Sequence, residues 1–129
     1  MSDRRQLHIK EDVKCSCKGY TLDKMLQPNI LILLAKKDLH GYSIIRELEK
    51  KNLFQGEKAD NTGIYRALRT LRDKGMVRSE WDVDGAGAAK KIYNITDLGR
   101  VCLKNWIKTL EEYRGTIETM IGDAKAALE

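Results

Sequence analysis

Apolar and polar residues follow a helical period in several parts of this chain, and the clearest such segment spans residues 61–77. In the stretch NTGIYRALRTLRDKGMV, apolar side chains recur at spacings of three and four residues, which places them on one face of a helix. That face consists of Ile64, Ala67, Leu68 and Leu71. The pattern predicts a helix with one buried face, which ends at Gly75 because glycine readily adopts the left-handed terminating conformation.

Two helices are expected upstream of this segment. Pro28 opens a run, residues 30–34, that is apolar on all sides and therefore predicts a helix buried in the core. A second helix is expected over residues 41–51, with one face that packs against the helix of residues 61–73. That face is expected to contain Tyr42, Ile45 and Leu48. His40, just before this helix, is interpreted as a local hydrogen-bonding or capping residue rather than as a ligand or a catalytic group.

The segment after Gly75 predicts a β-hairpin. The stretch MVRSEWDV alternates apolar and polar residues, and KKIYNIT follows after an Asp-Gly pair and small residues. Two helices, a third helix with exposed arginines and then a hairpin form the order of a winged helix-turn-helix. The predicted fold class is therefore mainly α with a small β-hairpin, in a winged helix-turn-helix domain plus a C-terminal helix.

The last part of the chain predicts one long helix with Thr96 as its cap. Leu98 and Val101 are expected to pack on the preceding domain, and beyond them apolar residues form a heptad seam. The seam consists of Leu103, Trp106, Leu110, Tyr113, Ile117, Met120 and Ala124. Burial of such side chains contributes about 1.5 to 3 kcal/mol each, which favours a homodimer through this helix. The alternative is a seam that folds back within one chain, but no unassigned apolar helix remains to receive it.

Taken together, the segments quoted above and PNILILLAKKDLHGYSIIRELEK resemble the PadR-like transcriptional regulators, the phenolic-acid-decarboxylase repressor family. The matching marks run from about residue 27 to residue 100. They are Pro28, His40-Gly41-Tyr42, Gly63-Ile64-Tyr65-Arg66 with Leu68 and Leu71, Gly75-Met76-Val77, Trp81, and Tyr93-x-Ile95-Thr96-x-x-Gly99. The resemblance implies a dimeric winged-helix DNA-binding regulator, usually a repressor and often released by a small molecule.

The family's effectors are often flat aromatic molecules. Trp106 and Tyr113, at the predicted dimer seam, are candidates to stack on such an effector. Two aromatic residues at heptad positions are more often part of a core, so both interpretations stay open. The operator, the regulated gene and the effector do not follow from the residues.

In the predicted helix of residues 61–73, Thr62, Arg66 and Arg69 point away from the buried face, and Tyr65 and Arg72 lie on the flanks. Guanidinium groups pair with phosphates and read guanine edges, so such a face is suited to a DNA groove. The candidate DNA-binding residues are Asn61, Thr62, Tyr65, Arg66, Arg69 and Arg72 on the helix, and Lys90 and Lys91 on the return strand of the hairpin. Arg66 and Arg69 are expected to reach base edges, while the lysines act through charge.

Two features of the hairpin argue against strong DNA binding by the wing. Its tip, residues 85–89, contains only glycine and alanine, and Glu80, Asp82 and Asp84 would repel phosphate if they faced it. The alternatives to a DNA-binding helix are therefore a solvated basic surface, or a winged-helix protein-interaction module without sequence-specific DNA binding.

Composition and length agree with one domain that has a polyanionic partner. The chain has 129 residues, with 24 Lys and Arg against 19 Asp and Glu, and a formal net charge of +5. Such a balance favours nucleic acid as a partner. We expect residues 1–20 to form a flexible N-terminal arm, residues 21–96 the winged helix-turn-helix DNA-binding domain, and residues 97–129 the dimerisation helix.

Motifs of enzymes, of cofactor binding and of membrane targeting are missing from the sequence. GxSxG, P-loop, HExxH and CxxC patterns do not occur, so no enzyme activity and no cofactor are expected. The longest apolar run has the length of a core helix and not of a membrane span, and MSDRRQLHIKEDVK is too polar for a secretory signal. The expected localisation is cytoplasmic.

Three cysteines are an odd number, which argues against a disulfide framework. They are Cys15, Cys17 and Cys102. In a dimer, two copies of Cys15-x-Cys17 would supply four thiolates, enough for a tetrahedral zinc site. The alternative is a mobile arm with unliganded thiols.

Overall fold

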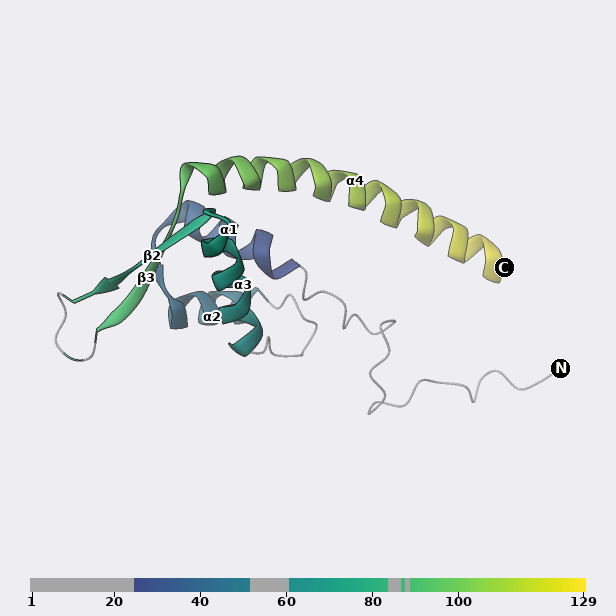
Figure 1. Ribbon diagram of the computed structural model, residues 1–129. Coiled ribbons are helices and arrows are strands. Elements are labelled where there is room, and N and C mark those ends of the chain that lie inside the picture. The colour runs from purple at the N-terminus through teal and green to yellow at the C-terminus, as the bar shows by residue number, and fades with distance from the viewer. Residues whose placement is uncertain (1–24, 52–60, 84–86, 88) are drawn as a thin grey trace, which may run out of the picture.

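The computed structural model describes residues 25–51, 61–83, 87 and 89–129 (Figure 1). Its elements follow in the order α1 (Leu26–Lys36), β1 (Leu39–His40), α2 (Gly41–Lys50), α3 (Asn61–Asp73), β2 (Val77–Asp82), β3 (Lys90–Ile95) and α4 (Asp97–Leu128). The first three helices and the sheet form a small body, and α4 crosses it and continues well beyond it (Figure 1). The predicted fold class, mainly α with a small hairpin and a long C-terminal helix, is confirmed. The expected N-terminal arm, with Cys15 and Cys17, lies outside the described residues.

The hydrophobic core is centred on α1. Ile30 and Leu31 are completely buried, as the apolar pattern of this helix predicts. The buried face of α3 is also as predicted and consists of Ile64, Ala67, Leu68 and Leu71. Because that face is buried, the opposite face of α3 is turned to solvent.

One core prediction for α2 is wrong. Ile45 and Leu48 are buried as expected, but the Tyr42 side chain is 47% exposed and Ile44 is buried instead. Positions two residues apart lie on opposite sides of a helix, so Tyr42 cannot share the buried face of Ile44. The Tyr42 ring lies instead beside the wing, where Lys90 Nζ is 5.1 Å from the ring centroid.

The sheet has three antiparallel strands in the order β1-β3-β2. Strands β2 and β3 form the predicted hairpin, in register from Val77 opposite Ile95 to Asp82 opposite Lys90. The two-residue strand β1, which pairs with Ile92 and Tyr93 on β3, was not predicted. It is too short to leave an alternating pattern in the sequence, and its effect is to bring the start of α2 beside the wing.

The end of α3 has the predicted glycine termination. Gly75 has a φ of 76°. The Gly75 amide donates to the Arg72 carbonyl oxygen at 3.0 Å, and the Met76 amide donates to the Leu71 carbonyl oxygen at 2.9 Å. These two bonds make a Schellman motif, which turns the chain directly from α3 into β2.

Thr96 caps α4 as predicted and also links it to the end of α3. Its Oγ1 accepts a hydrogen bond from the Gly99 amide at 3.0 Å and donates one to the Gly75 carbonyl oxygen at 2.6 Å. The Thr96 amide donates to the Met76 carbonyl oxygen at 3.1 Å. One residue thus joins the turn after α3, the end of β3 and the start of α4.

The prediction that Leu98 and Val101 pack on the winged body is wrong, since they are 52% and 53% exposed. The side of α4 that packs there begins at Gly99, which lies directly against the Met76 carbonyl and the Ile95 side chain. Residues three, four and seven positions further share that side, and they are Cys102, Leu103 and Trp106. Within the described ranges, no helix is both long and apolar enough to cross a bilayer.

Candidate nucleic-acid interface

The exposed face of α3 carries every helix residue that the sequence singled out for DNA binding. These residues, all solvent-exposed, are Asn61, Thr62, Tyr65, Arg66, Arg69 and Arg72. Thr62 and Arg69 lie near the middle of this face, opposite the buried one, by the helical period. A weak 3.9 Å ion pair joins the Arg72 and Asp73 side chains. The face therefore presents a row of guanidinium groups to solvent.

The wing lysines occupy the start of β3, as predicted. Lys90 Nζ lies over the Tyr42 ring, and Lys91 Nζ lies 5.5 Å from the centroid of the Trp81 ring. An ammonium held over an aromatic face is attracted by the ring quadrupole while its other side stays open to solvent. Both lysines are thus positioned by aromatic residues without being neutralised by them.

The loop end of β2 is attached to the start of α2 through His40. Its Nε2 lies 3.1 Å from Asp82 Oδ2, and its ring stacks on Tyr42 with a centroid distance of 6.1 Å. His40 is therefore a hydrogen-bonding residue, as interpreted, but its partner is distant in the sequence and its side chain does not cap α2. The Asp82 carboxylate, expected to repel phosphate, is engaged by an imidazole. Glu80 is exposed, and Asp84 lies outside the described residues.

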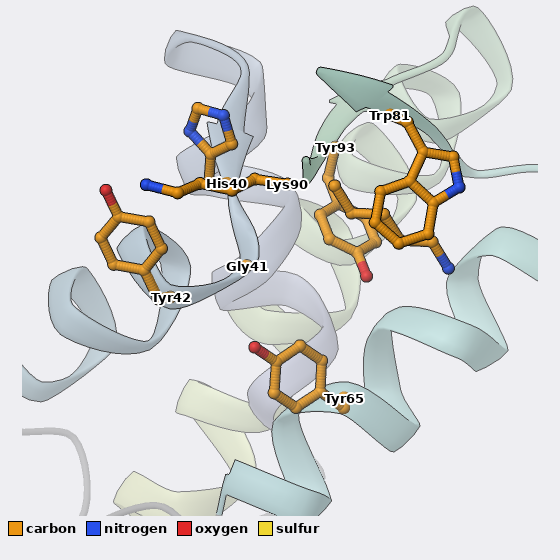
Figure 2. A pocket seen from close by; sticks show the side chains of 8 residues that line it. His40, Gly41, Tyr42, Tyr65, Trp81, Lys90 and Tyr93 are labelled. Carbon is orange, nitrogen blue, oxygen red and sulfur yellow. The ribbon is translucent and has the colours of Figure 1, made fainter. Parts of the chain in front are cut away.

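A pocket of about 280 Å³ opens between the start of α2, the flank of α3 and the wing (Figure 2). Its lining consists of His40, Gly41, Tyr42, Tyr65, Trp81, Lys90, Lys91 and Tyr93. Four separate segments contribute to it, so the sequence alone did not reveal it. Tyr65 was singled out as a DNA-binding residue, yet its phenol ring lies against Gly41, where an added Cβ would sit 3.1 Å from the hydroxyl oxygen.

Tyr93, on β3, is the buried residue of this pocket, with only 6% of its surface exposed. Burial raises the pKa of the Tyr93 hydroxyl above its ordinary value of 10.0, and proximity to Tyr65 raises it further, while the positive charge of Arg72 acts in the opposite direction. The neutral phenol is therefore the form that the folded state favours.

This shift predicts how stability depends on alkaline pH. Because the Tyr93 pKa is higher in the folded than in the unfolded chain, its contribution is fully present below pH 10.0 and is lost as pH rises through the raised pKa. Tyr93→Phe should therefore lose less stability than the wild type between neutral pH and pH about 11. Urea unfolding at several pH values checks this, with Tyr42→Phe as an exposed control. Identical pH profiles for Tyr93→Phe and the wild type would contradict it.

The projecting part of α4 exposes an apolar stripe. Of the predicted seam residues, Leu103 and Trp106 are half-buried against their own core, and Leu110 is half-buried. Tyr113, Ile117 and Met120 are about half exposed, at 47%, 49% and 56%. Ile107 and Ile121, also exposed, lie on the same side of the helix and were missed because they fall between the strict heptad positions.

The comparisons with known proteins agree with this geometry. Residues 30–105 match the transcriptional regulator PadR-like family. The chain belongs to this family. The negative transcriptional regulator PadR of Bacillus subtilis is 34% identical to this PadR-like chain over 84 residues, which cover 65% of this chain and 46% of that protein. The chain thus spans about half the length of that relative.

Solved structures of PadR-like proteins have the same fold. The crystal structure of Bacillus subtilis PadR in complex with operator DNA matches with a TM-score of 0.56 at 34% identity, over 65% of this chain and 47% of that one. A transcriptional regulator from Clostridium thermocellum matches with a TM-score of 0.67 at 22% identity, over 76% of this chain and 94% of that one, and supports the fold alone. The PadR-like family consists of transcriptional regulators, which agrees with the prediction that the chain is not an enzyme.

The zinc hypothesis for this PadR-like chain stays a prediction. Cys15 and Cys17 lie outside the described residues, and the thiol of Cys102 is free and half-buried beside Trp106. In the part of the chain that the structure describes, no three His, Cys, Asp or Glu residues gather closely enough to hold a metal ion.

Proposed function

We propose that this PadR-like chain is a cytoplasmic transcriptional repressor that binds a pseudo-palindromic DNA operator as a homodimer. The observation that carries the proposal is the exposed face of α3, where Arg66 and Arg69 project opposite the buried apolar face and Arg72 lies exposed on the flank. A helix presented in this way is able to enter the major groove with its guanidinium groups near guanine edges. PadR of Bacillus subtilis, a negative transcriptional regulator that was crystallised with operator DNA, supports DNA as the ligand and repression as the outcome.

The proposed dimer forms through α4. Its projecting part exposes Tyr113, Ile117 and Met120, and apolar surface of this kind is stabilised when a second helix covers it. In this arrangement, residues 21–96 act as the DNA-binding domain and residues 97–129 as the dimerisation helix. Two-fold symmetry then separates the two α3 helices by about 34 to 36 Å, one turn of DNA, or by a multiple of that distance.

A small aromatic effector completes the proposal. Trp106, Cys102, Asn105 and Thr109 surround a hollow of about 120 Å³ on α4, next to the apolar stripe. A flat ring stacked on Trp106 near the dimer interface would change the packing of α4 against its partner. DNA affinity would then depend on the ligand.

The test of the proposed function compares two cationic residues with different roles. Arg69→Ala should weaken binding to the cognate operator by about 1 to 3 kcal/mol and relax its sequence preference, whereas Lys91→Ala should weaken all duplexes alike. Mobility-shift titrations on DNA upstream of the chain's own gene, at several salt concentrations, measure both effects. Because Lys91→Ala removes one phosphate partner, the slope of the logarithm of DNA affinity against the logarithm of salt concentration should become shallower by about one.

A second candidate function is a winged-helix protein-interaction module. The exposed carboxylate of Glu80 on β2 favours it, because this group lies on the wing strand and would repel a DNA backbone. Unchanged operator affinity and salt slope in Arg69→Ala would mean that α3 does not read DNA. The interaction module would then be the better account.

A further inference from the structure

The pocket beside α3 gathers hydrogen-bond donors and positive charge. Among the described residues that line it, none has a carboxylate, and the nearby Asp82 is engaged by His40. Lys90 lies over Tyr42 and Lys91 over Trp81, and these two rings stand on opposite sides of the pocket, while the phenol hydroxyls of Tyr65 and Tyr93 point into the space between α2 and α3 (Figure 2). Such a lining is suited to an anion.

The N-terminus of α2 adds backbone donors to this pocket. The 10-residue helix begins at Gly41, and the side chain at its cap position, His40, makes no capping bond because its Nε2 is directed to Asp82. The first amides of a helix lack intrahelical acceptors and carry the positive end of the helix dipole. Gly41 lines the pocket, and because it has no Cβ the Tyr65 ring and hydroxyl can lie directly against the first turn of α2.

Tyr93 gives an independent indication of a ligand. The residue is more than nine-tenths buried, its hydroxyl is aimed into the pocket (Figure 2), and no described residue accepts a hydrogen bond from it. The hydroxyl oxygen itself remains accessible from the pocket, because no side-chain oxygen or nitrogen of the described residues is both buried and without a hydrogen-bond partner. An acceptor that arrives from outside would complete the hydroxyl's hydrogen bonding.

We propose that this pocket seats one phosphodiester group of the DNA backbone, held by Lys90, the Tyr93 hydroxyl and the first amides of α2. The inference rests on the proposed function and adds a backbone contact that is separate from the reading face of α3. The pocket lies between that face, through Tyr65, and the wing, through Lys90 and Lys91. A duplex held against α3 would run its backbone along this path, where the flat faces of Tyr42 and Trp81 can pack against a deoxyribose.

A phosphate contact positions the protein without reading sequence. Removal of its donors should therefore lower affinity for cognate and arbitrary duplexes by the same factor. This behaviour distinguishes the pocket from Arg69, whose removal is expected to relax sequence preference. The two sets of residues should thus be separable in one binding experiment.

The experiment measures duplex binding by Tyr93→Phe, Lys90→Gln and a matched charge control, Lys125→Gln, near the far end of α4. Tyr93→Phe should lower affinity for operator and arbitrary duplexes alike by about tenfold, as expected when a hydrogen bond to a charged group is removed. Its thermal stability at neutral pH should be unchanged or higher, since the hydroxyl has no partner among the described residues. Lys90→Gln should also reduce the salt slope by about one, and Lys125→Gln should leave it unchanged.

A scan of the operator with single neutral methylphosphonates identifies the contact itself. One position in each half-site should weaken wild-type binding, and at that position Tyr93→Phe should cause no further loss. If Tyr93→Phe and Lys90→Gln bind DNA as tightly as the wild type while Arg69→Ala does not, the proposed phosphate contact in this pocket is wrong and the proposed function stands. If the wild-type chain binds no duplex, both the phosphate contact and the proposed function are contradicted.

Inorganic phosphate provides the last arm of the test. At constant ionic strength, added inorganic phosphate should not change the fluorescence of Trp81, measured in a Trp106→Phe variant. It should also not displace a duplex that is already bound. Saturable binding of inorganic phosphate that excludes DNA would make the pocket a site for a free anion, and the DNA assignment would be overturned.

Discussion

Ile117→Glu is expected to convert the proposed dimer into monomers without unfolding them. Ile117 is 49% exposed on the part of α4 that projects beyond the winged body, so the monomer loses little when it is changed. In the dimer, however, the substitution would remove two buried isoleucines and bring two carboxylates into an apolar interface. A dissociation constant raised roughly a thousandfold is expected from the reduced burial alone, with further weakening from the charges.

Analytical ultracentrifugation over a range of protein concentrations measures this effect, and circular dichroism reports on folding. Thr119→Glu is the matched control because Thr119 is exposed on the opposite side of the same helix, where its hydroxyl donates only to the Gly115 carbonyl. The control should remain dimeric. A dimer of unchanged affinity in Ile117→Glu would mean that the interface lies elsewhere.

Gly99→Ala is expected to destabilise the fold, although alanine is normally the better helix former. A Cβ at this position would overlap the Met76 carbonyl and would lie 2.7 Å from Ile95 Cγ1. The backbone of α4 must therefore move away from the turn after α3. The expected loss of stability is about 2 to 3 kcal/mol, as for other overpacked sites.

Two glycines on the same helix provide the control for this experiment. A Cβ at Gly115 or Gly122 would meet no atom within 4 Å, so alanine there should stabilise the helix by about 0.5 to 1 kcal/mol. Urea unfolding of the three variants measures the difference. Equal stabilisation by all three would show that α4 does not approach Met76 closely.

The elements that the sequence predicted well are those with one strongly periodic apolar face. The pattern of Ile64, Ala67, Leu68 and Leu71 identifies α3 because burial of that face requires no information from elsewhere in the chain. Tyr42 was misassigned because an aromatic side chain at a helix start can lie on the core or under a lysine from the wing, and only the tertiary structure decides. Leu98 and Val101 were misassigned because Gly99, which carries no apolar signal, determines the side of α4 that faces the body.

The candidate site was predictable only as far as it lies on single elements. Charge and periodicity indicated Arg66 and Arg69, and the hairpin pattern indicated Lys90 and Lys91. The pocket was not predictable, since it depends on the pairing of β1 with β3, which brings His40 opposite Ile92. A two-residue strand leaves no periodicity to detect, and the unpartnered hydroxyl of Tyr93 is visible only once its neighbours are known.

The hydrogen bonds of Thr96 connect α4 rigidly to α3, the proposed DNA-reading helix. Since this residue bonds both the Gly75 carbonyl at the end of α3 and the Gly99 amide in the first turn of α4, the two helices cannot turn independently at their junction. The 32 residues of α4 extend for about 48 Å, so a rotation of about 5° at this joint moves its far end by about 4 Å. In the proposed dimer the coupling would also act in the opposite direction. A displacement at the contact between the two α4 helices would change the angle at which each α3 faces its DNA half-site.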